Sequence, residues 1–194
     1  LTGRIPIEVP PGRNGMQPNL ALSYASSGGN SWTGMGWKLE VGTIERQTKW
    51  GVLYNPTTAE ENAGKVYTMR LNGISTDLML DFTVPLAYHE KIKSGFLRIR
   101  KLSADGTAGW EVTDTKGTRY TFGATERIEN GTMIFKWCLE KVVDRDGNYL
   151  TVTYTEDLGQ YYLDHIDYGG NDGSGGGSVL PHTNTVKFYL ETRT

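Results

Sequence analysis

Short runs of alternating apolar and polar residues make up most of the chain, and pairs of turn-forming residues separate them. Alternation with a period of two is typical of half-buried strands, whereas the period of a helix is nowhere sustained. The runs predict strands at residues 5–9, 20–24, 37–48 with a bulge at Gly42, 65–71, 74–82, 96–102, 110–113, 119–122, 126–128, 133–143, 149–155, 161–168 and 186–191. We therefore predict a mainly β chain of about a dozen antiparallel strands rich in hairpins.

The turn pairs specify how neighbouring strands connect. Asn72-Gly73 and Asn130-Gly131 are the residue pairs favoured in two-residue hairpin turns, so we predict both at hairpin tips. Asp105-Gly106 and Asp146-Gly147 separate other pairs of runs in the same way. Pro6 cannot donate a hydrogen bond to a neighbouring strand, which places the first run at an edge or at the start of a sheet.

Two stretches fall outside this pattern. The polar residues 55–64 predict either one short helical turn capped by Thr57 or Thr58, or a loop. Residues 169–178 have the composition of a flexible Gly/Ser-rich loop. Only one run follows that loop, so we interpret residues 1–194 as a single β-rich fragment of a larger protein.

Length and charge exclude several classes of protein. The chain has 194 residues and a formal net charge of −2, which offers no basic surface for nucleic acid. No apolar run of about 18 residues is present, so we expect no membrane span. Cys138 is alone, so no disulfide forms within the chain.

The residues that most often carry catalysis are scattered. His89, His165 and His182 are far apart and show no metal-ligand spacing, so we expect surface or strand-end histidines. Alternation places Cys138 on the strand face opposite Trp137, where a small buried thiol is expected in preference to a nucleophile. We accordingly predict no catalytic residue, no metal ligand and no cofactor.

One acidic turn has an alternative interpretation as an ion site. Asp144, Asp146 and Asn148 form D-x-D-G-N, but the glycine and the following residues do not keep EF-hand spacing. A β-turn with Asx hydrogen bonds is the favoured interpretation. Asn171 and Asp172 are a weaker candidate for the same role.

The aromatic residues also allow two interpretations. Five tryptophans and eleven tyrosines could form a flat sugar-binding face, but alternating aromatics in strands more often pack in a core. We predict that Trp37 and Trp137 are mostly buried and serve as core anchors.

Motifs at both ends of the chain resemble one known family. They are PPGRNG at residues 10–15, PNLALSY at 18–24, GMGW at 34–37, WCLEKVVDRDGN at 137–148, YYLDHIDYG at 161–169 and VKFYLETR at 186–193. This set resembles the SpvB and Tc-toxin B-component family, which consists of large secreted bacterial virulence proteins related to the Rhs (YD-repeat) proteins. The likeness is looser between about residues 52 and 110.

The resemblance implies a structural function. In that family, long β-sheets wind into a hollow shell that encloses a toxic enzyme located elsewhere in the protein. This chain would then be a secreted wall segment of an Rhs-type β-shell without enzymatic activity. Its partners would be other segments of the same protein or toxin-complex subunits, with self-association possible.

Two other functions compete with this one. A secreted carbohydrate- or surface-binding β-sandwich would need exposed, coplanar aromatic side chains on one face. An enzyme would need a pocket that brings His165 together with Asp164 or Asp167 and a nucleophile.

Overall fold

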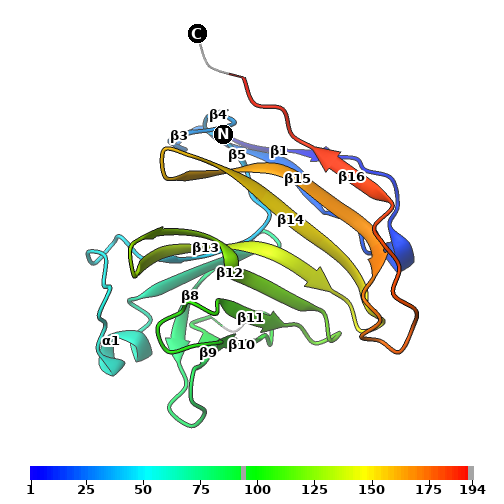
Figure 1. The fold of residues 1–194 in the computed structure, drawn as a ribbon. Coiled ribbons are helices and arrows are strands. Elements are labelled where there is room, and N and C mark those ends of the chain that lie inside the picture. Colours follow the sequence, from blue (N-terminus) through cyan, green and yellow to red (C-terminus); the bar gives the residue numbers. More distant parts are fainter. Residues whose placement is uncertain (93–94, 192–194) are drawn as a thin grey trace.

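The structure is a computed structural model that describes residues 1–92 and 95–191, and the prediction of mainly antiparallel β structure is confirmed (Figure 1). A three-stranded sheet contains β1 (Thr2–Ile7), β2 (Leu20–Ala25) and β5 (Trp37–Leu39), and β3 (Asn30–Ser31) pairs with β4 (Gly34–Met35). The large sheet contains β6 (Thr43–Arg46), β7 (Tyr67–Leu71), β8 (Ile74–Leu80), β9 (Ala87–Glu90), β10 (Arg98–Lys101), β11 (Trp110–Thr113), β12 (Arg119–Asn130), β13 (Met133–Val143), β14 (Asn148–Asp157), β15 (Gln160–Asn171) and β16 (Asn184–Lys187).

Eight strands of the large sheet close on themselves. Each strand from β6 to β12 pairs with the next, and β13 pairs with both β12 and β6, which gives a barrel-like ring. The remaining strands, β14 to β16, continue outward from β13 as an open sheet. The closure was not predicted, because nothing in the local pattern says that β6 and β13 are neighbours.

The predicted hairpin tips are confirmed. Asn72 and Gly73 have φ values of 52° and 80° between β7 and β8, as a type I′ turn requires. Asn130 is the last paired residue of β12 and lies opposite Met133, so the two loop residues there are Gly131 and Thr132. The second turn is therefore shifted by one residue from the predicted pair.

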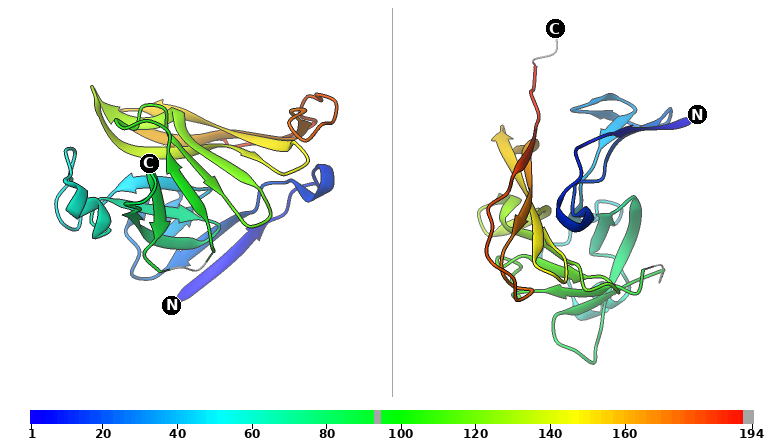
Figure 2. Two further views of the ribbon diagram at one scale, coloured as in Figure 1. Left: turned by 90° about the horizontal axis from the view of Figure 1, so that it is seen from below. Right: turned by 90° about the vertical axis from the view of Figure 1, so that its right-hand side faces the viewer.

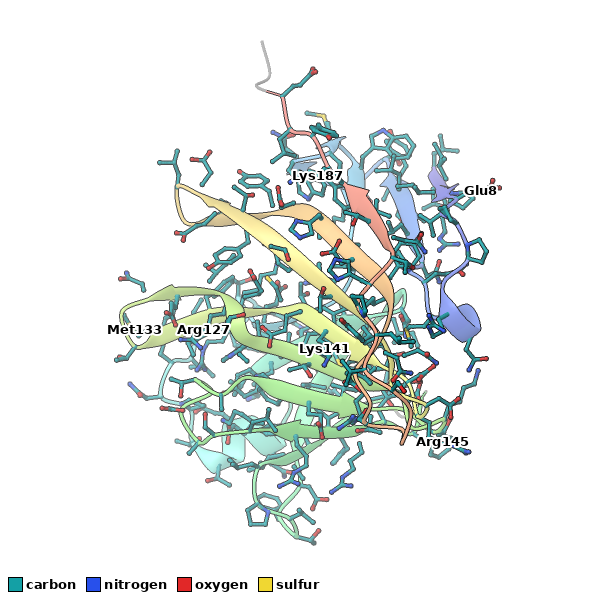
Figure 3. All side chains as sticks on the ribbon, turned by 45° about the vertical axis from the view of Figure 1, so that its right-hand side comes forward. Glu8, Arg127, Met133, Lys141, Arg145 and Lys187 are labelled. Carbon is teal, nitrogen blue, oxygen red and sulfur yellow. The ribbon has the colours of Figure 1, made fainter. Side chains whose placement is uncertain are left out.

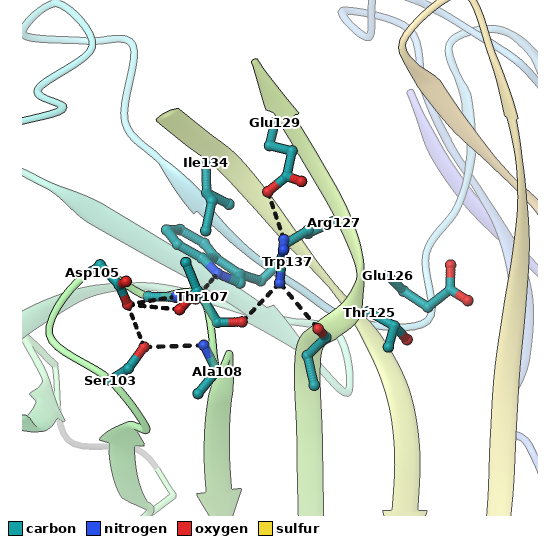
Figure 4. A network of polar contacts seen from close by, with 12 residues as sticks. Ser103, Asp105, Thr107, Ala108, Thr125, Glu126, Arg127, Glu129, Ile134 and Trp137 are labelled. Carbon is teal, nitrogen blue, oxygen red and sulfur yellow. Dashed lines mark hydrogen bonds and ion pairs between the residues drawn. The ribbon is translucent and has the colours of Figure 1, made fainter. Parts of the chain in front are cut away.

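Aromatic rings fill the closed sheet. Tyr67, Tyr88, Trp110 and Trp137 are all buried, and their ring centroids lie 4.9–5.8 Å apart in tilted or edge-to-face contacts. The Trp137 indole N–H donates to the Gly106 carbonyl at 2.9 Å, beneath the turn that joins β10 and β11 (Figure 4). The prediction that Trp137 is a buried core anchor is confirmed.

Gly42 marks a change of sheet and not the predicted bulge. It separates β5 in the small sheet from β6 in the large one, and the predicted continuous strand over 37–48 is therefore wrong. The Leu139 N–H donates to the Gly42 carbonyl at 3.0 Å, at the point where β13 changes partner from β6 to β14. Gly42 has φ +155°, and a Cβ there would lie 3.2 Å from Leu139 Cβ, so close packing requires glycine.

The three-stranded sheet faces β13 to β15 across the molecule (Figure 2, right). β1 pairs only with β2, which confirms the predicted edge strand. Trp37 belongs to this small sheet, where it is half-buried and its ring centroid lies 5.1 Å from that of Tyr24. The prediction that Trp37 is a core anchor is therefore wrong, because its side chain stays partly exposed and lies outside the central hydrophobic cluster.

Several element boundaries differ from the prediction. Residues 119–122 and 126–128 lie in one strand, β12, whose pairing with β13 shifts register on both sides of Phe122. The last predicted strand, 186–191, is replaced by β16, which ends at Lys187, and β9 was not predicted. The helical alternative for 55–64 is confirmed by α1 (Thr58–Asn62), which Thr57 caps through a capping box with Glu60.

The expected loop at residues 169–178 begins inside a strand. Residues 169–171 are the buried end of β15, and only the turn after them is exposed. Gly175 in that turn packs closely on the backbone of Asp146. Mobility of the exposed part stays a prediction.

Candidate functional site

The motifs from the two ends of the chain meet in space. Pro10, Arg13 and Asn14 belong to the first motif, and Tyr168, Gly169 and Asp146 belong to the last ones. The Tyr168 hydroxyl donates to the Pro10 carbonyl at 3.0 Å, and Arg13 Nε donates to the Gly169 carbonyl at 3.4 Å. Asn14 Nδ2 donates to Asp146 Oδ2 at 3.3 Å. These motifs therefore hold the first turn of the chain against the ends of β14 and β15.

The acidic turn at residues 144–148 forms Asx hydrogen bonds. Asp144 Oδ1 accepts from the backbone N–H groups of Asp146 and Asn148 at 2.9 and 2.8 Å, and Asp144 Oδ2 accepts from Asn148 Nδ2 at 2.8 Å. Asn171 Nδ2 donates to the Asp146 carbonyl and to Asn148 Oδ1. The β-turn interpretation is confirmed, and Asn171 acts as a bridge between two turns.

Asp172 belongs to the same region. Lys141 Nζ lies 3.0 Å from Asp172 Oδ2, and Lys141 extends toward this end of the sheet (Figure 3). Desolvation favours the neutral carboxyl, but hydrogen bonds from Ser174 and from Lys141 outweigh it and lower the pKa of Asp172 to about 2. Within residues 1–92 and 95–191, no group of three or more His, Cys, Asp or Glu side chains could hold a metal ion.

The histidine and aspartates named as possible catalytic groups do come together. His165 Nδ1 lies 2.5 Å from Asp164 Oδ2, and His165 and His182 each place Nε2 within 3.5 Å of Asp167 Oδ2. Lys187 lies on β16 (Figure 3), and its Nζ contacts Asp164 Oδ1 at 2.5 Å. The cluster joins β16 to β15 by ion pairs and hydrogen bonds. His89 is remote from it, in β9.

Cys138 is a buried thiol, as predicted. Burial raises the pKa of its thiol to about 12, so it stays protonated at neutral pH and is a poor nucleophile. The hydroxyl of Tyr154, which is partly buried, donates to the Leu139 carbonyl at 2.9 Å. Both residues line a cavity of about 790 Å³ between the small sheet and β13 to β15.

A cavity of about 660 Å³ beside α1 is lined by charged and aromatic residues that the sequence analysis did not single out. Arg46 at the end of β6 and Lys101 at the end of β10 line it, although only 6% and 7% of their surfaces are exposed. Both follow an inward-facing isoleucine by two positions, so alternation places each charged side chain inside the closed sheet. The sequence could have shown this, because each charged residue stands at a position where the alternation expects a buried side chain.

Lys101 has partners in this cavity. Its Nζ lies 3.5 Å from Glu61 Oε1, and the Tyr88 hydroxyl donates to the same oxygen at 2.8 Å. Lys101 Nζ also lies 3.4 Å from the Tyr67 hydroxyl. Burial raises the pKa of Tyr88, which keeps its hydroxyl a donor at neutral pH. Glu61 comes from α1, so this ion pair attaches the short helix to the sheet.

Arg46 is held differently. Its Nε donates to the Ile134 carbonyl at 2.7 Å, and its Nη1 donates to the Leu53 carbonyl at 2.5 Å. The guanidinium lies 5.2 Å from the ring centroids of both Tyr54 and Tyr67. Its partners are therefore carbonyl oxygens and aromatic faces.

Comparisons with known proteins agree with the motifs. The family model described as "Salmonella virulence plasmid 65kDa B protein" (SpvB) matches residues 1–172. The mono(ADP-ribosyl)transferase SpvB of Salmonella typhimurium is 24% identical over 208 residues, which cover 97% of this chain and 34% of that protein. The chain thus spans about a third of the length of the SpvB relatives it matches.

Solved structures share the fold. The N-terminal domain of the effector SpvB from Salmonella typhimurium LT2 matches with a TM-score of 0.62 and 21% identity over 79% of this chain and 59% of that one. The TcdB2-TccC3-Cdc42 structure matches with a TM-score of 0.65 and 22% identity over 91% of this chain and 10% of that one. By its family match over most of its length, and by its fold, this chain belongs to the SpvB family and resembles its amino-terminal region.

Proposed function

We propose that this chain is a wall segment of a toxin-complex-type β-shell, with a structural function and no enzymatic activity of its own. The observation that carries the proposal is β1. Residues Thr2 to Pro6 are all exposed, and one edge of the strand pairs with nothing in the described residues. A strand exposed on both faces and along one edge is a template for pairing with further chain.

The other end of the chain supports the same proposal. β16 is the last strand of the open sheet, and after it the chain leaves the body of the molecule (Figure 1). Tyr189 in that exit segment is almost fully exposed. In a complete shell, we expect both edges to continue into neighbouring strands of the same protein or of other toxin-complex subunits.

The similar solved structures show this fold as one part of a much longer chain. The TcdB2-TccC3 structures contain a segment of this fold within a chain about ten times longer, because the match covers only 10% of that chain. We propose that the chain works in the same way, as one part of a larger secreted protein whose toxic activity resides elsewhere. ADP-ribosyl transfer is named for the Salmonella relative, of which this chain matches about a third.

Concentration-dependent association tests the proposal. We expect the 194-residue chain to self-associate in multi-angle light scattering over a concentration series, because the outer edges of β1 and β16 pair with no strand of the described residues. Ile5→Lys should suppress that association by placing a charge on β1. Ile74→Lys is the matched control, since Ile74 is similarly exposed, 43% against 51% for Ile5, but pairs with Leu71 in the β7–β8 hairpin, away from the edge of β1. A wild-type chain that stays monomeric, or two variants with equal effects, would contradict the proposal.

Absence of turnover is the second test. We expect the purified chain neither to consume NAD⁺ nor to transfer ADP-ribose to protein. NAD⁺ consumption that is lost in His165→Ala would show an enzyme in place of a wall segment.

The carbohydrate-binding alternative requires exposed, coplanar aromatic rings. Trp137 is fully buried within the closed sheet, and Trp37 is half-buried against Tyr24. These two rings thus do not form a common exposed face.

A further inference from the structure

We infer that the cavity beside α1 binds a carboxylate carried on an apolar body. This goes beyond the proposed function, since a wall segment needs no ligand. The carrying observation is Arg46, whose surface is 6% exposed and which lines the cavity. Among the described residues, Arg46 has no carboxylate partner, and its Nη2 donates no hydrogen bond.

None of the carboxylates that line the cavity forms an ion pair with Arg46. Two cations line it, Arg46 and Lys101, together with the carboxylates of Glu61, Asp81 and Asp105. Glu61 is engaged by Lys101 and by the Tyr88 hydroxyl. Among the described residues, Arg46 is therefore a largely buried cation of the cavity lining that forms no ion pair.

The other two carboxylates serve their own turns. Asp81 Oδ1 accepts from the backbone N–H and the hydroxyl of Thr83 at 2.8 and 2.6 Å. Asp105 Oδ1 accepts from the Ser103 hydroxyl and from Thr107, and these hydrogen bonds lower its pKa to about 2 (Figure 4). Both are rim groups that hold loops in place and do not pair with Arg46.

A carboxylate ligand fits the guanidinium. A buried charge is costly unless it is paired, and a carboxylate can accept hydrogen bonds from two guanidinium nitrogens at once. Nη2 and the second hydrogen of Nη1 are the donors available, because Nε and Nη1 already bind the Ile134 and Leu53 carbonyls. These two hydrogen bonds orient the Arg46 guanidinium before a ligand binds, which lowers the conformational-entropy cost of binding.

The walls select an apolar body. Besides the charged groups, the cavity is lined by tyrosine, phenylalanine, leucine and proline side chains: Tyr54, Tyr67, Leu80, Phe82, Pro85 and Tyr88. A volume of about 660 Å³ suits a ligand of several to a few tens of heavy atoms, within the usual range of small-molecule sites. Two sources supply this chemistry: a free small acid, or the C-terminal residue of a peptide.

Matched acid and amide probes test the inference on the whole chain. Phenylacetate and phenylacetamide differ only in charge, and N-acetyl-phenylalanine and its amide do the same for a peptide end. Titrations followed by tryptophan fluorescence report on Trp110 and Trp137, whose rings contact Tyr67. We expect saturable binding of the acids and about tenfold or greater weakening for the amides, as for loss of a charged hydrogen bond. The tighter of the two acids identifies the source.

Variants locate the binding. Phe82 lines the cavity and is exposed, so Phe82→Ala should weaken both acids severalfold without unfolding the chain. Phe96→Ala is the control, because Phe96 is also exposed but does not line the cavity. Arg46→Lys should reduce the preference for acid over amide, with folding checked by circular dichroism.

The inference fails if acids and amides bind equally, if neither binds saturably, or if Phe82→Ala and Phe96→Ala behave alike. These outcomes do not require Arg46→Lys to fold. They are also separate from the association test, since Ile5 lies on β1 and not in the cavity.

Discussion

The closed sheet and the open part of the molecule use the same kind of strand in opposite ways. In β6, β7 and β9, every second residue is buried inside the closed sheet. The aromatic side chains Trp110 and Trp137 pack on each other there. In β1, residues Thr2 to Pro6 are exposed on both faces. In a closed sheet, every strand has hydrogen-bonded neighbours on both sides, and side chains fill the interior. An open sheet leaves edge strands whose backbone groups can pair with another strand.

The centre of the closed sheet is filled, whereas cavities lie beside α1 and in the open part of the molecule. Spaces of about 790 and 260 Å³ lie between the small sheet and the strands around β13, where the facing layers leave room between them. In the closed sheet, by contrast, Trp110, Trp137 and Phe122 are fully buried. Under the proposed function, further chain would complete the open part, whereas the closed sheet already surrounds its own core.

The largest effect is expected from truncating the central ring of the closed sheet. Trp137→Ala should lower the free energy of unfolding by about 3–5 kcal/mol, the range for large aromatic truncations in cores. Trp37→Ala, in the small sheet, should cost clearly less because Trp37 is only half-buried. Urea denaturation measures both, and equal losses would remove the distinction between the two regions.

A glycine next to Trp137 provides the second test. Gly123 has φ +59°, and a Cβ there would lie 2.4 Å from Trp137 Cδ1, so Gly123→Ala combines backbone strain with overpacking. Each effect costs about 1–3 kcal/mol. Gly131 has φ +60° and nothing within 4 Å, so Gly131→Ala incurs only the strain of about 1–2 kcal/mol. The comparison fails if both variants lose the same stability.

Hydrogen exchange sharpens the contrast between paired and edge strands. Trp137 in β13 has partners on both sides, Arg127 and Ile44, whereas Val186 in β16 pairs only with Ile166. Amides near Trp137 should exchange through global unfolding and those of β16 through local opening, with protection lower by orders of magnitude. Similar protection in both strands would argue for a single cooperative unit.

The smallest effect concerns an ion pair of the open part. The pKa of Asp172 is lowered from 3.8 to about 2 in the folded chain, so its interactions contribute stability above pH 3.8. That contribution is lost as the pH falls through about 2. Asp172→Asn should therefore be less stable than wild type at pH 7, and the difference should shrink from pH 4 downward in urea denaturation. A difference independent of pH would show that the charge of Asp172 contributes nothing.

The sequence by itself determined the local structure. Period-two alternation gave the strand class, Asn72-Gly73 gave a hairpin tip because both residues tolerate positive φ, and Thr57 with Glu60 gave the helix start. The Asx turn at Asp144 followed from side chains that bond to their own backbone. Each of these depends on interactions between residues close in sequence, which a local pattern records directly.

Tertiary structure alone decided which elements meet. Gly42 reads locally as a bulge, yet it carries the chain from one sheet to another because Leu139, far away in sequence, supplies its hydrogen-bond donor. For Arg46 and Lys101, the alternation in the sequence indicates only that the side chains face inward. Closure of the sheet places them in one cavity with Glu61. Such pairings depend on contacts across the whole chain, and many registers satisfy the same alternation until the ring closes.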